Sequence, residues 1–366
     1  MDSQWVMDEL QHVALFDKRL ELRFQKLLDC LSKASTASIP AACNDRAEMV
    51  AAYRFFDNEK VTFESVIEPH IESTYRRIKS QKVTLLIQDT TELDLTRPHS
   101  EVHGDGPLQN GKRCGALLHL LHAFTTDGTP LGTVSAEAWS RELKTDKPVK
   151  RGSSEKRIQI KNRPFEEKET YRWLTTAQHC TAIKSHLPKT QLVMLADRES
   201  DITEVIDMYR SQNAFDWVIR SDGDRIINKE KKSNPSIPIR EALRKTPPLF
   251  TRDLDIRARE SWGSATLKHH PSRADRRDRV VSVSVYSGEV TLNDPRAGKR
   301  DGVSVRAVLV QEIKPTQNDE PIEWLLLTNL PISMRDEVEL VIEYYLLRWM
   351  IESFFKVLKS GCKIES

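Results

Sequence analysis

Three acidic residues stand where the sequence could support metal-dependent chemistry. Asp197 directly follows the short apolar segment 192–196, and Asp89 is separated by one residue from the segment 83–87; each segment predicts a buried strand. Catalytic groups often gather at strand ends in mixed sheets. An aspartate at such a position also commonly caps a turn or a helix, so neither residue is decisive by itself. The third acidic residue, Glu352, belongs to a different pattern near the end of the chain.

Residues 338–359 are expected to form one helix with a polar face. The polar positions are separated by three or four residues, which places them on one side of a helix. They are Tyr345, Arg348, Glu352, Lys356 and Lys359. The apolar positions fall opposite and are expected to be buried. They are Leu347, Met350, Ile351, Phe354 and Leu358.

A polar face of this kind occurs on any surface helix, so it does not establish a site. Trp349 and Phe355 flank the polar face instead of joining the apolar one. Large aromatic side chains beside a solvated face are unusual, and they indicate that something packs there.

The first region that must position these residues is helical and covers 1–80. Apolar residues recur at helical spacing over 20–31, and Pro40 lies near the first turn of a second helical stretch. A third helix includes 51–56, and a fourth begins after 61–62. Several short helices joined by tight turns suit a small DNA-binding bundle, and they equally suit any other small bundle.

From residue 83 onward the pattern predicts an α/β fold. A hairpin is expected over 116–139 around the turn 126–130, followed by a polar surface loop and a helix over 167–186. A strand is expected at 215–220. The following stretch, 222–340, is rich in strands and loops, and its strands are expected at 280–292, 303–313 and 322–330.

Composition places the 366-residue chain among soluble globular proteins, with 39% hydrophobic and 30% charged residues. No apolar segment approaches the roughly 18 residues that a membrane helix needs. Five scattered cysteines argue against a disulfide framework and a structural zinc site, and fit a cytoplasmic protein. The net charge of +2 does not indicate a nucleic-acid partner. Basic residues do cluster locally, at 273–279 and 296–300, which is also typical of solvated loops.

Taken together, these segments resemble the bacterial DDE transposases of the IS-four family, especially those of the Tn-five type. The residues Tyr345, Arg348, Glu352 and Lys359 have the spacing of the family's Tyr-Arg-Glu-Lys signature. Segments 87–91 and 196–201 resemble the surroundings of its first two catalytic aspartates. Segment 323–328 resembles the strand before its last catalytic helix. Segments 17–20, 38–40 and 51–56 resemble its DNA-binding domain, so the resemblance covers nearly the whole chain.

The resemblance implies a ribonuclease-H-like core with a β-rich insertion, preceded by a small helical DNA-binding domain. The helical domain would cover 1–80 and the catalytic domain 81–366, with the insertion at about 222–340. Family members continue with a helical region that pairs two subunits as a homodimer across two transposon ends. That dimerisation region is expected to be absent here, and this shortened chain is expected to be bacterial, cytoplasmic and associated with the nucleoid.

The resemblance also implies the chemistry. Asp89, Asp197 and Glu352 would hold two Mg²⁺ ions roughly 4 Å apart, and Mn²⁺ would substitute for them. Double-stranded DNA would be nicked at the transposon end, closed into a hairpin, reopened and joined to target DNA. Every step would be an in-line phosphoryl transfer at the same site.

The DNA contacts implied by the resemblance come from charged and aromatic side chains. Arg348 would grip a phosphate with both arms of its guanidinium, and Tyr345 would hydrogen-bond a phosphate oxygen. Further cations are Lys356, Lys359 and Arg220. Trp324 would stack on a base flipped out of the duplex, although in the sequence alone it equally fits a core tryptophan.

Two other functions remain compatible with the sequence. The first is a truncated form of the transposase that binds DNA or inhibits transposition without cutting. The intact acidic triad argues against it. The second is a ribonuclease-H-fold nuclease of repair or recombination, against which the N-terminal helices and the insertion carrying Trp324 argue.

Overall fold

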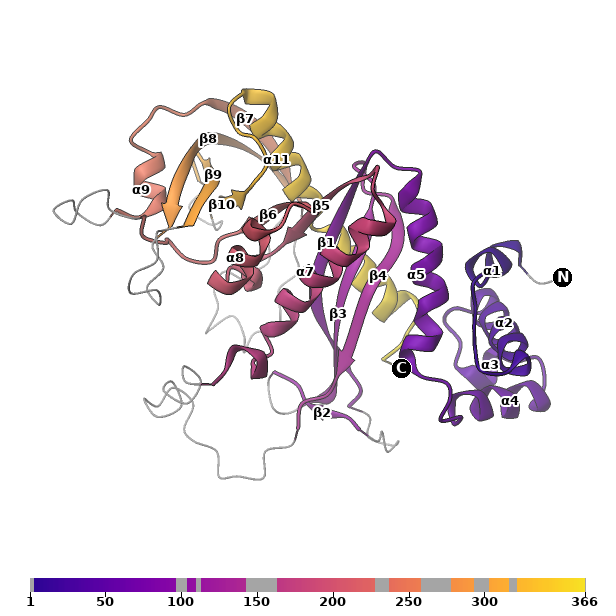
Figure 1. Cartoon of the computed structure of the whole chain (residues 1–366). Coiled ribbons are helices and arrows are strands. Elements are labelled where there is room, and N and C mark those ends of the chain that lie inside the picture. The colour runs from indigo at the N-terminus through magenta and orange to yellow at the C-terminus, as the bar shows by residue number, and fades with distance from the viewer. Residues whose placement is uncertain are drawn as a thin grey trace. The chain divides into compact units, whose positions relative to one another are not determined.

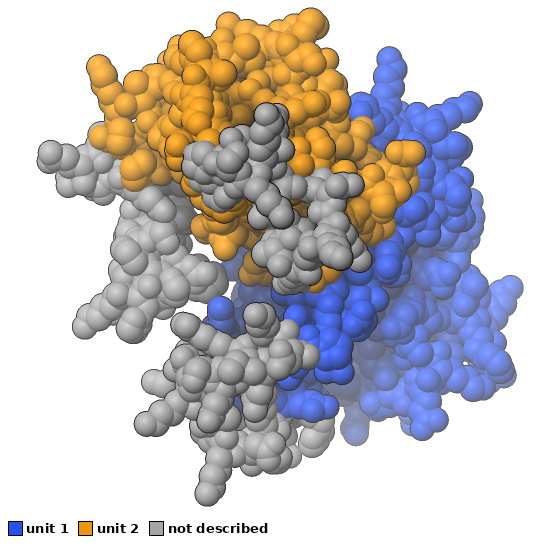
Figure 2. Space-filling view, turned by 60° about the vertical axis from the view of Figure 1, so that its left-hand side comes forward, with its two compact units in different colours: residues 1–194, 347–366 blue, residues 195–346 orange. Residues whose placement is uncertain are grey.

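The computed structural model describes residues 3–96, 104–109, 113–142, 163–227, 237–257, 278–292, 303–315 and 321–365. They form helices and β-sheet, which confirms the predicted α/β class. The chain divides into two compact units (Figure 2). The first comprises 1–194 and 347–366, and the second comprises 195–346. The predicted catalytic residues Asp89 and Glu352 belong to the first unit, whereas Asp197 belongs to the second.

The first unit begins with four helices, of which the last three were predicted and the first was not. They are α1 (Gln4–Glu9), α2 (Lys18–Lys33), α3 (Ile39–Ala42) and α4 (Arg46–Phe56). The fourth predicted helix is α5 (Phe63–Lys79). Asp17 caps α2 by accepting from the Arg19 backbone N–H, and Asp45 caps α4 in the same manner. The apolar faces enclose a small core, in which the rings of Phe24 and Phe55 stack with their centroids 5.6 Å apart.

A long fifth helix, α5 (Phe63–Lys79), connects this bundle to the sheet of the first unit (Figure 1). A capping box formed by Thr62 and Ser65 starts the helix. The helix lies against β4 (Pro130–Trp139) at Gly132. A Cβ atom at Gly132 would lie 2.2 Å from the Thr74 hydroxyl oxygen, so only glycine allows this approach.

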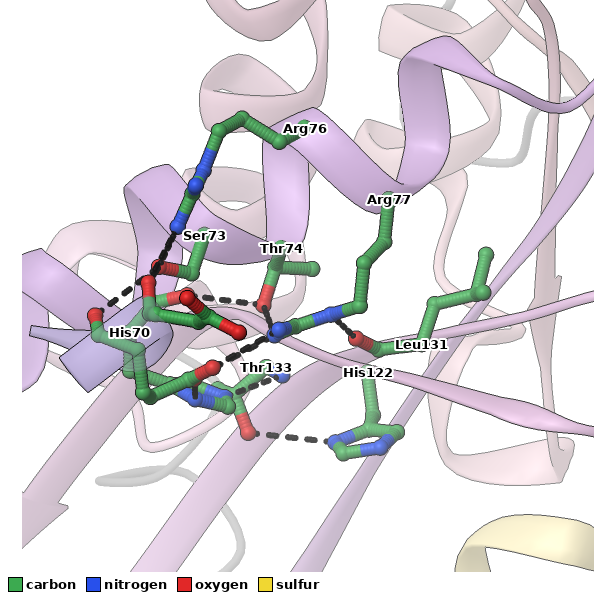
Figure 3. A network of polar contacts seen from close by, with 10 residues as sticks. His70, Ser73, Thr74, Arg76, Arg77, His122, Leu131 and Thr133 are labelled. Carbon is green, nitrogen blue, oxygen red and sulfur yellow. Dashed lines mark hydrogen bonds and ion pairs between the residues drawn. The ribbon is translucent and has the colours of Figure 1, made fainter. Parts of the chain in front are cut away.

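Three charged or polar side chains hold the junction of α1, α5 and β4, and we call them the Glu9 cluster: Glu9, His70 and Arg77 (Figure 3). Arg77 donates to Glu9 Oε2 at 2.7 Å and to the Leu131 carbonyl oxygen. His70 Nδ1 also bonds Glu9, and His70 Nε2 accepts from the Thr133 N–H at 2.8 Å. The cluster therefore connects two helices to a strand.

The sheet of the first unit is centred on β1 (Val83–Asp94) and β3 (Cys114–Phe124). They pair antiparallel, and β4 pairs antiparallel with β3, which confirms the predicted hairpin. The short strand β2 (Gly106–Pro107) also pairs with β3, and β5 (Gln191–Ala196) lies beside β1.

Two helices cover opposite faces of this sheet. On one face, α7 (Tyr171–Ile183) packs Trp173 against His119 of β3, with ring centroids 4.9 Å apart. On the other, α12 (Met350–Lys356) packs Phe354 against His122, with centroids 4.3 Å apart. His119 and His122 are separated by an odd number of positions, so their side chains project from opposite faces of β3. The predicted helix 167–186 thus appears as α7, preceded by a 3-10 turn (Phe165–Glu167) and followed by another (Lys184–His186).

The predicted end of β1 is wrong. The strand was expected to stop before Asp89, but it continues to Asp94, and Asp89 is paired with Leu120. The apolar segment marks only the fully buried half of the strand. Residues 89–94 are half-buried and polar, and they stay in the strand because β3 continues to supply hydrogen-bonding partners as far as Gly115.

The second unit contains the strands β6 (Asp216–Arg220), β10 (Glu323–Thr328), β9 (Val303–Glu312), β8 (Arg279–Leu292) and β7 (Phe250–Ile256), neighbours in that order. Its helices include α8 (Thr203–Ser211), α9 (Ile239–Leu243) and most of α11 (Arg335–Leu347). The three strands predicted within 222–340 are confirmed as β8, β9 and β10. A buried ion pair, Arg279–Glu312 at 2.7 Å, joins β8 to β9.

The predicted final helix is present but divided into α11, α12 and a π-helical turn (Val357–Gly361). The predicted polar face is wrong for two of its members, because Tyr345 and Arg348 are buried. Phe355, which was expected beside that face, is buried too. Helical spacing predicts the angular position of a side chain, but the neighbouring elements decide which sides of the helix are covered.

Several sequence predictions fall partly or wholly outside the described residues. These are most of the basic segment 273–279, the basic segment 296–300 and much of the polar loop 141–168. The five cysteines are all described and all free, as expected. Within the described ranges, no helix combines the length and apolar character that a membrane span requires.

Candidate active site

The site in the first unit consists of two carboxylates with an arginine between them, and we call it the Asp89 cluster: Asp89, Arg348 and Glu352. Arg348 Nη2 donates to Glu352 Oε1 at 2.6 Å. Arg348 Nη1 lies 3.6 Å from Asp89 Oδ2, which is an ion pair with looser geometry. The backbone N–H of Thr90 donates to Asp89 Oδ1 at 2.7 Å. The fold therefore brings together three of the predicted site residues from distant parts of the sequence.

The members of the Asp89 cluster differ in their exposure to solvent. The Arg348 side chain is only 6% exposed, and its guanidinium lies 4.8 Å from the centroid of the Trp349 ring. Asp89 is 15% exposed, whereas Glu352 is 44% exposed. A buried guanidinium offers fixed donors in a medium of low polarity, which strengthens its attraction for anions. The partly open carboxylates can be reached from solvent.

The two predicted lysines have different surroundings. Lys356 is exposed at the end of α12, one turn beyond Glu352. Lys359 is half-buried: its ammonium donates to the Glu92 carbonyl oxygen and lies 3.5 Å from the Glu365 carboxylate. Glu365 in turn accepts from the Asp94 N–H at 2.9 Å. Lys359 therefore fastens the last turn of the described chain to the polar half of β1.

Further charged residues surround that half of β1 and were not singled out in the sequence. Arg113 pairs with Glu92 at 3.3 Å and with Asp94 at 3.0 Å. Arg141 lies 3.7 Å from Glu92. No local spacing announces these contacts, since they depend on the pairing of β1 with β3. The only signal was the acidic composition of residues 89–94.

Thr90 begins a second polar chain on the face of β1 that α7 covers. Its hydroxyl oxygen lies 2.8 Å from Arg172 Nε and 2.8 Å from His119 Nδ1. His119 Nε2 lies 3.1 Å from the Thr176 hydroxyl. Burial, helped by the positive charge of Arg172, lowers the pKa of His119 to about 3. This histidine is therefore neutral at physiological pH and serves to orient its neighbours.

In the second unit, Asp197 directly follows β5, as predicted, and begins the 3-10 turn η3 (Arg198–Ser200). Asp197 Oδ1 accepts from the Glu199 N–H at 2.8 Å. The capping role anticipated from the sequence is therefore real. It occupies one oxygen of the carboxylate, and the side chain is half-buried.

The predicted DNA contacts of the second unit are mostly buried. Trp324 is 6% exposed, and its ring centroid lies 5.5 Å from that of Tyr345, which is 3% exposed. This packing is what the core-tryptophan interpretation predicts. Arg220, at the end of β6, donates to the Glu323 carbonyl oxygen at 3.1 Å.

The donor set of the Asp89 cluster fits a hard divalent cation, because carboxylate oxygens are the ligands that Mg²⁺ and Mn²⁺ prefer. Asp89 and Glu352 both bind the same guanidinium, so their oxygens already converge on a positive charge. Among the described residues, no group of three or more His, Cys, Asp or Glu side chains is gathered closely enough to hold a metal ion. Two of the three predicted ligands are thus adjacent, and Asp197 is described with the other unit.

Comparison with known families identifies the N-terminal helices. Residues 2–61 match the family model described as transposase DNA-binding. The match covers α1 to α4 and the turn that leads to α5. It supports a transposase and identifies DNA as a partner, which the bundle of short helices alone did not distinguish from other small bundles.

Proposed function

We propose that this chain is a DNA transposase of the DDE type, similar to the IS-four family, in which Asp89, Asp197 and Glu352 carry metal-dependent strand cleavage and joining. The observation that carries the proposal is the Asp89 cluster. Two acidic residues that are far apart in the sequence contact one buried arginine, in a chain whose N-terminal helices match a transposase DNA-binding family.

The order of elements supports the same proposal. A strand with Asp89 is followed by a hairpin, a helix, the strand β5 that ends just before Asp197, the helix α8 and a strand that ends at Arg220. A strand-rich stretch comes next, and the helix with Glu352 comes last. This is the order expected of a ribonuclease-H-like core with a β-rich insertion, so the fold agrees with the function at the level of connectivity.

The residues of the Asp89 cluster have distinct roles in the proposed reaction. Asp89 and Glu352 would supply two carboxylates as metal ligands, and Asp197 would supply the third carboxylate. Divalent cations held by these oxygens would activate water and neutralise charge on the attacked phosphate. Arg348 keeps the two carboxylates of its unit in place and presents guanidinium N–H groups to an incoming phosphate. Lys356, exposed one turn further along α12, adds positive charge for the DNA backbone.

The proposed sequence of reactions is nicking of the transposon end, hairpin formation, reopening of the hairpin and strand transfer. Mg²⁺ is the proposed cofactor, with Mn²⁺ as substitute, and a homodimer is the proposed state of the paired-end complex. The proposed DNA contacts outside the Asp89 cluster are Tyr345, Lys359, Trp324 and Arg220. Because Trp324 and Tyr345 pack on each other, stacking of a flipped base on Trp324 requires that pair to open.

The proposal is tested by Mn²⁺-dependent nicking of a plasmid that carries the DNA flanking the gene for this chain, including its terminal repeats. Asp89→Asn is compared with the unchanged chain, and binding to the same DNA is measured in parallel. We expect nicking at the element boundary, a loss of at least about 1,000-fold in Asp89→Asn, and equal DNA binding by both proteins.

The other outcomes separate the rival functions. Nicking by Asp89→Asn near the rate of the unchanged chain would refute the assigned site. Specific DNA binding with no nicking by either protein would favour a non-catalytic or inhibitory form of the transposase. Nicking without preference for the element boundary would favour a nuclease of repair or recombination.

A further inference from the structure

We propose that Asp201 is a positioning residue, which fixes the turn that carries Asp197 so that its free carboxylate oxygen can bind a metal ion. This inference rests on the proposed function, and it adds a residue to which that function assigns no role. It is drawn entirely from contacts within the second unit. The residues concerned are Asp197, Asp201, Ser221, Asp222 and Arg225.

Asp201 is a buried carboxylate with unusually complete pairing. Its side chain is only 3% exposed. Arg225 Nε donates to Asp201 Oδ1 at 2.9 Å, and Arg225 Nη2 lies 2.6 Å from the same oxygen in an ion pair. Oδ2 lies 2.8 Å from the Ser221 hydroxyl and accepts from the Asp222 N–H at 2.9 Å. A buried charge is stable only when it is paired and hydrogen-bonded in this manner.

These contacts tie the turn after Asp197 to the end of β6. Ser221 follows β6 directly, and its N–H donates to the Leu325 carbonyl oxygen of β10 at 2.7 Å. Arg225 also donates to the Asp201 carbonyl oxygen at 2.9 Å and to the Thr203 hydroxyl at 3.3 Å. The segment that follows Asp197 is therefore anchored to a neighbouring strand by both the backbone and the side chain of Asp201.

The turn itself transmits this anchoring to Asp197. Ser200 is fully buried, and its hydroxyl donates to the Asp197 carbonyl oxygen at 2.8 Å. Asp197 Oδ1 is held by the Glu199 N–H. Among the described residues, no donor lies within hydrogen-bond distance of Asp197 Oδ2. β5 fixes the start of the turn η3, and Asp201 fixes its end. Both therefore set the direction in which Asp197 Oδ2 points.

Metal sites depend on the groups that hold their ligands in place, and here Asp201 acts on Asp197 through the turn between them and does not contact its carboxylate. Loss of such an outer partner typically lowers metal affinity or activity by about 10–100-fold, although the ligand itself is untouched. Asp201→Asn keeps the shape of the side chain but removes the charge that two arginine N–H groups require. We therefore expect the variant to bind metal more weakly while Asp197 remains in the chain.

The experiment is a titration of the whole chain with Mn²⁺ alone, in which the signal of free Mn²⁺ is followed by electron paramagnetic resonance. Asp201→Asn is compared with Glu312→Gln. Glu312 is an equally buried carboxylate of the same unit, paired with Arg279 at 2.7 Å and 3.0 Å, and it is remote in sequence from the Asp197 turn. We expect the Kd for Mn²⁺ to rise about 10–100-fold in Asp201→Asn and to stay unchanged in Glu312→Gln.

Two results would overturn the inference. One is Mn²⁺ binding by Asp201→Asn equal to that of the unchanged chain, and the other is an equal loss in Glu312→Gln, which would indicate general destabilisation. If circular dichroism shows that Asp201→Asn does not fold, the same titration is made with the milder variants Ser221→Ala and Arg225→Lys. We expect several-fold weaker Mn²⁺ binding in both, and unchanged binding in both would overturn the inference.

Asp197→Asn separates this inference from the proposed function. If Asp197→Asn binds Mn²⁺ normally, the proposed role of Asp197 fails. If Asp197→Asn loses binding while Asp201→Asn keeps it, only the positioning role of Asp201 fails.

Discussion

The Glu9 cluster and the Asp89 cluster both belong to the first unit, and in both an arginine contacts a carboxylate, yet they differ in how exposed their carboxylates are. In the Glu9 cluster one carboxylate receives both His70 and Arg77 and is only 14% exposed. In the Asp89 cluster one arginine is shared between two carboxylates. Glu352 is 44% exposed, and Asp89 Oδ2 lies 3.6 Å from Arg348 Nη1.

The comparison separates a cluster that joins elements from one that can bind a ligand. Burial raises the pKa of Glu9, but hydrogen bonds from His70 and Arg77 outweigh it and bring the pKa down to about 2. The charge of Glu9 is thus satisfied by the protein. In the Asp89 cluster one guanidinium contacts two carboxylates, and the more exposed of them, Glu352, can be reached by a cation from solvent. Four predictions test this distinction, from the largest expected effect to the smallest.

Replacing Arg348 should affect catalysis most. In Arg348→Ala the two carboxylates lose the donor between them and an incoming phosphate loses a fixed cation, so nicking should fall about 100–1,000-fold. Arg348→Lys keeps the positive charge but lacks the paired N–H groups of the guanidinium, so its nicking rate should fall less. Single-turnover nicking at saturating Mn²⁺ measures both. Nicking by Arg348→Ala within a few-fold of the unchanged chain would make the Asp89 cluster a structural one like the Glu9 cluster.

Replacing Glu9 should affect stability and leave chemistry intact. Glu9→Gln removes the carboxylate that His70 and Arg77 both contact, and we expect the free energy of unfolding to fall by about 2 kcal/mol. This is less than a fully buried pair would cost, because Arg77 is 38% exposed. Urea denaturation gives the free energy, and nicking at a temperature where the variant is folded provides the comparison. A large loss of nicking by the folded variant would contradict the prediction.

As the pH falls, the contact between His122 of β3 and α12 should weaken at a higher pH than the one at which Glu9 becomes protonated. Burial, helped by the positive charge of Arg77, lowers the pKa of His122 from 6.5 to about 3. The unfolded chain therefore takes up a proton below pH 6.5 that the folded chain does not, so stability falls with pH from about 6.5 to about 3.

Because of His122, the free energy of unfolding should be about 1.4 kcal/mol lower at pH 5.5 than at pH 8. Glu9 behaves differently: its stabilising charge is complete above pH 4.5 and is lost only as the pH falls toward 2. Urea denaturation of the unchanged chain and of His122→Asn at both pH values measures the difference. An identical pH dependence in the two proteins would show that His122 does not stay neutral.

The smallest effect is expected at Lys356, the exposed cation beside the Asp89 cluster. Lys356→Ala should weaken DNA binding several-fold and reduce the slope of log affinity against log salt by about one, as loss of one phosphate contact does. Lys189→Ala is a matched control, since Lys189 is also exposed and lies just before β5, outside both residues 2–61 and the Asp89 cluster. Equal salt slopes for Lys356→Ala and the unchanged chain would remove Lys356 from the DNA interface.

The sequence by itself determined the elements and the identity of the candidate residues. Helical spacing located α2 and α4, and apolar segments located β5 and β6, because these patterns depend on residues that are neighbours in the chain. For the same reason the turn after Asp197 was placed correctly. Resemblance then assigned Asp89, Asp197 and Glu352 to one catalytic site, an assignment that strand ends and helical spacing could not make.

Only the tertiary structure decided what surrounds those residues. The pairing of β1 with β3 keeps Asp89 inside the strand, and the packing of α12 buries Arg348 between Asp89 and Glu352. The burial of Trp324 against Tyr345 and the anchoring of Asp201 by Arg225 are likewise invisible in local sequence. Each joins residues that are distant along the chain, and the free energy of such contacts depends on shape and burial, which the spacing of residues does not encode.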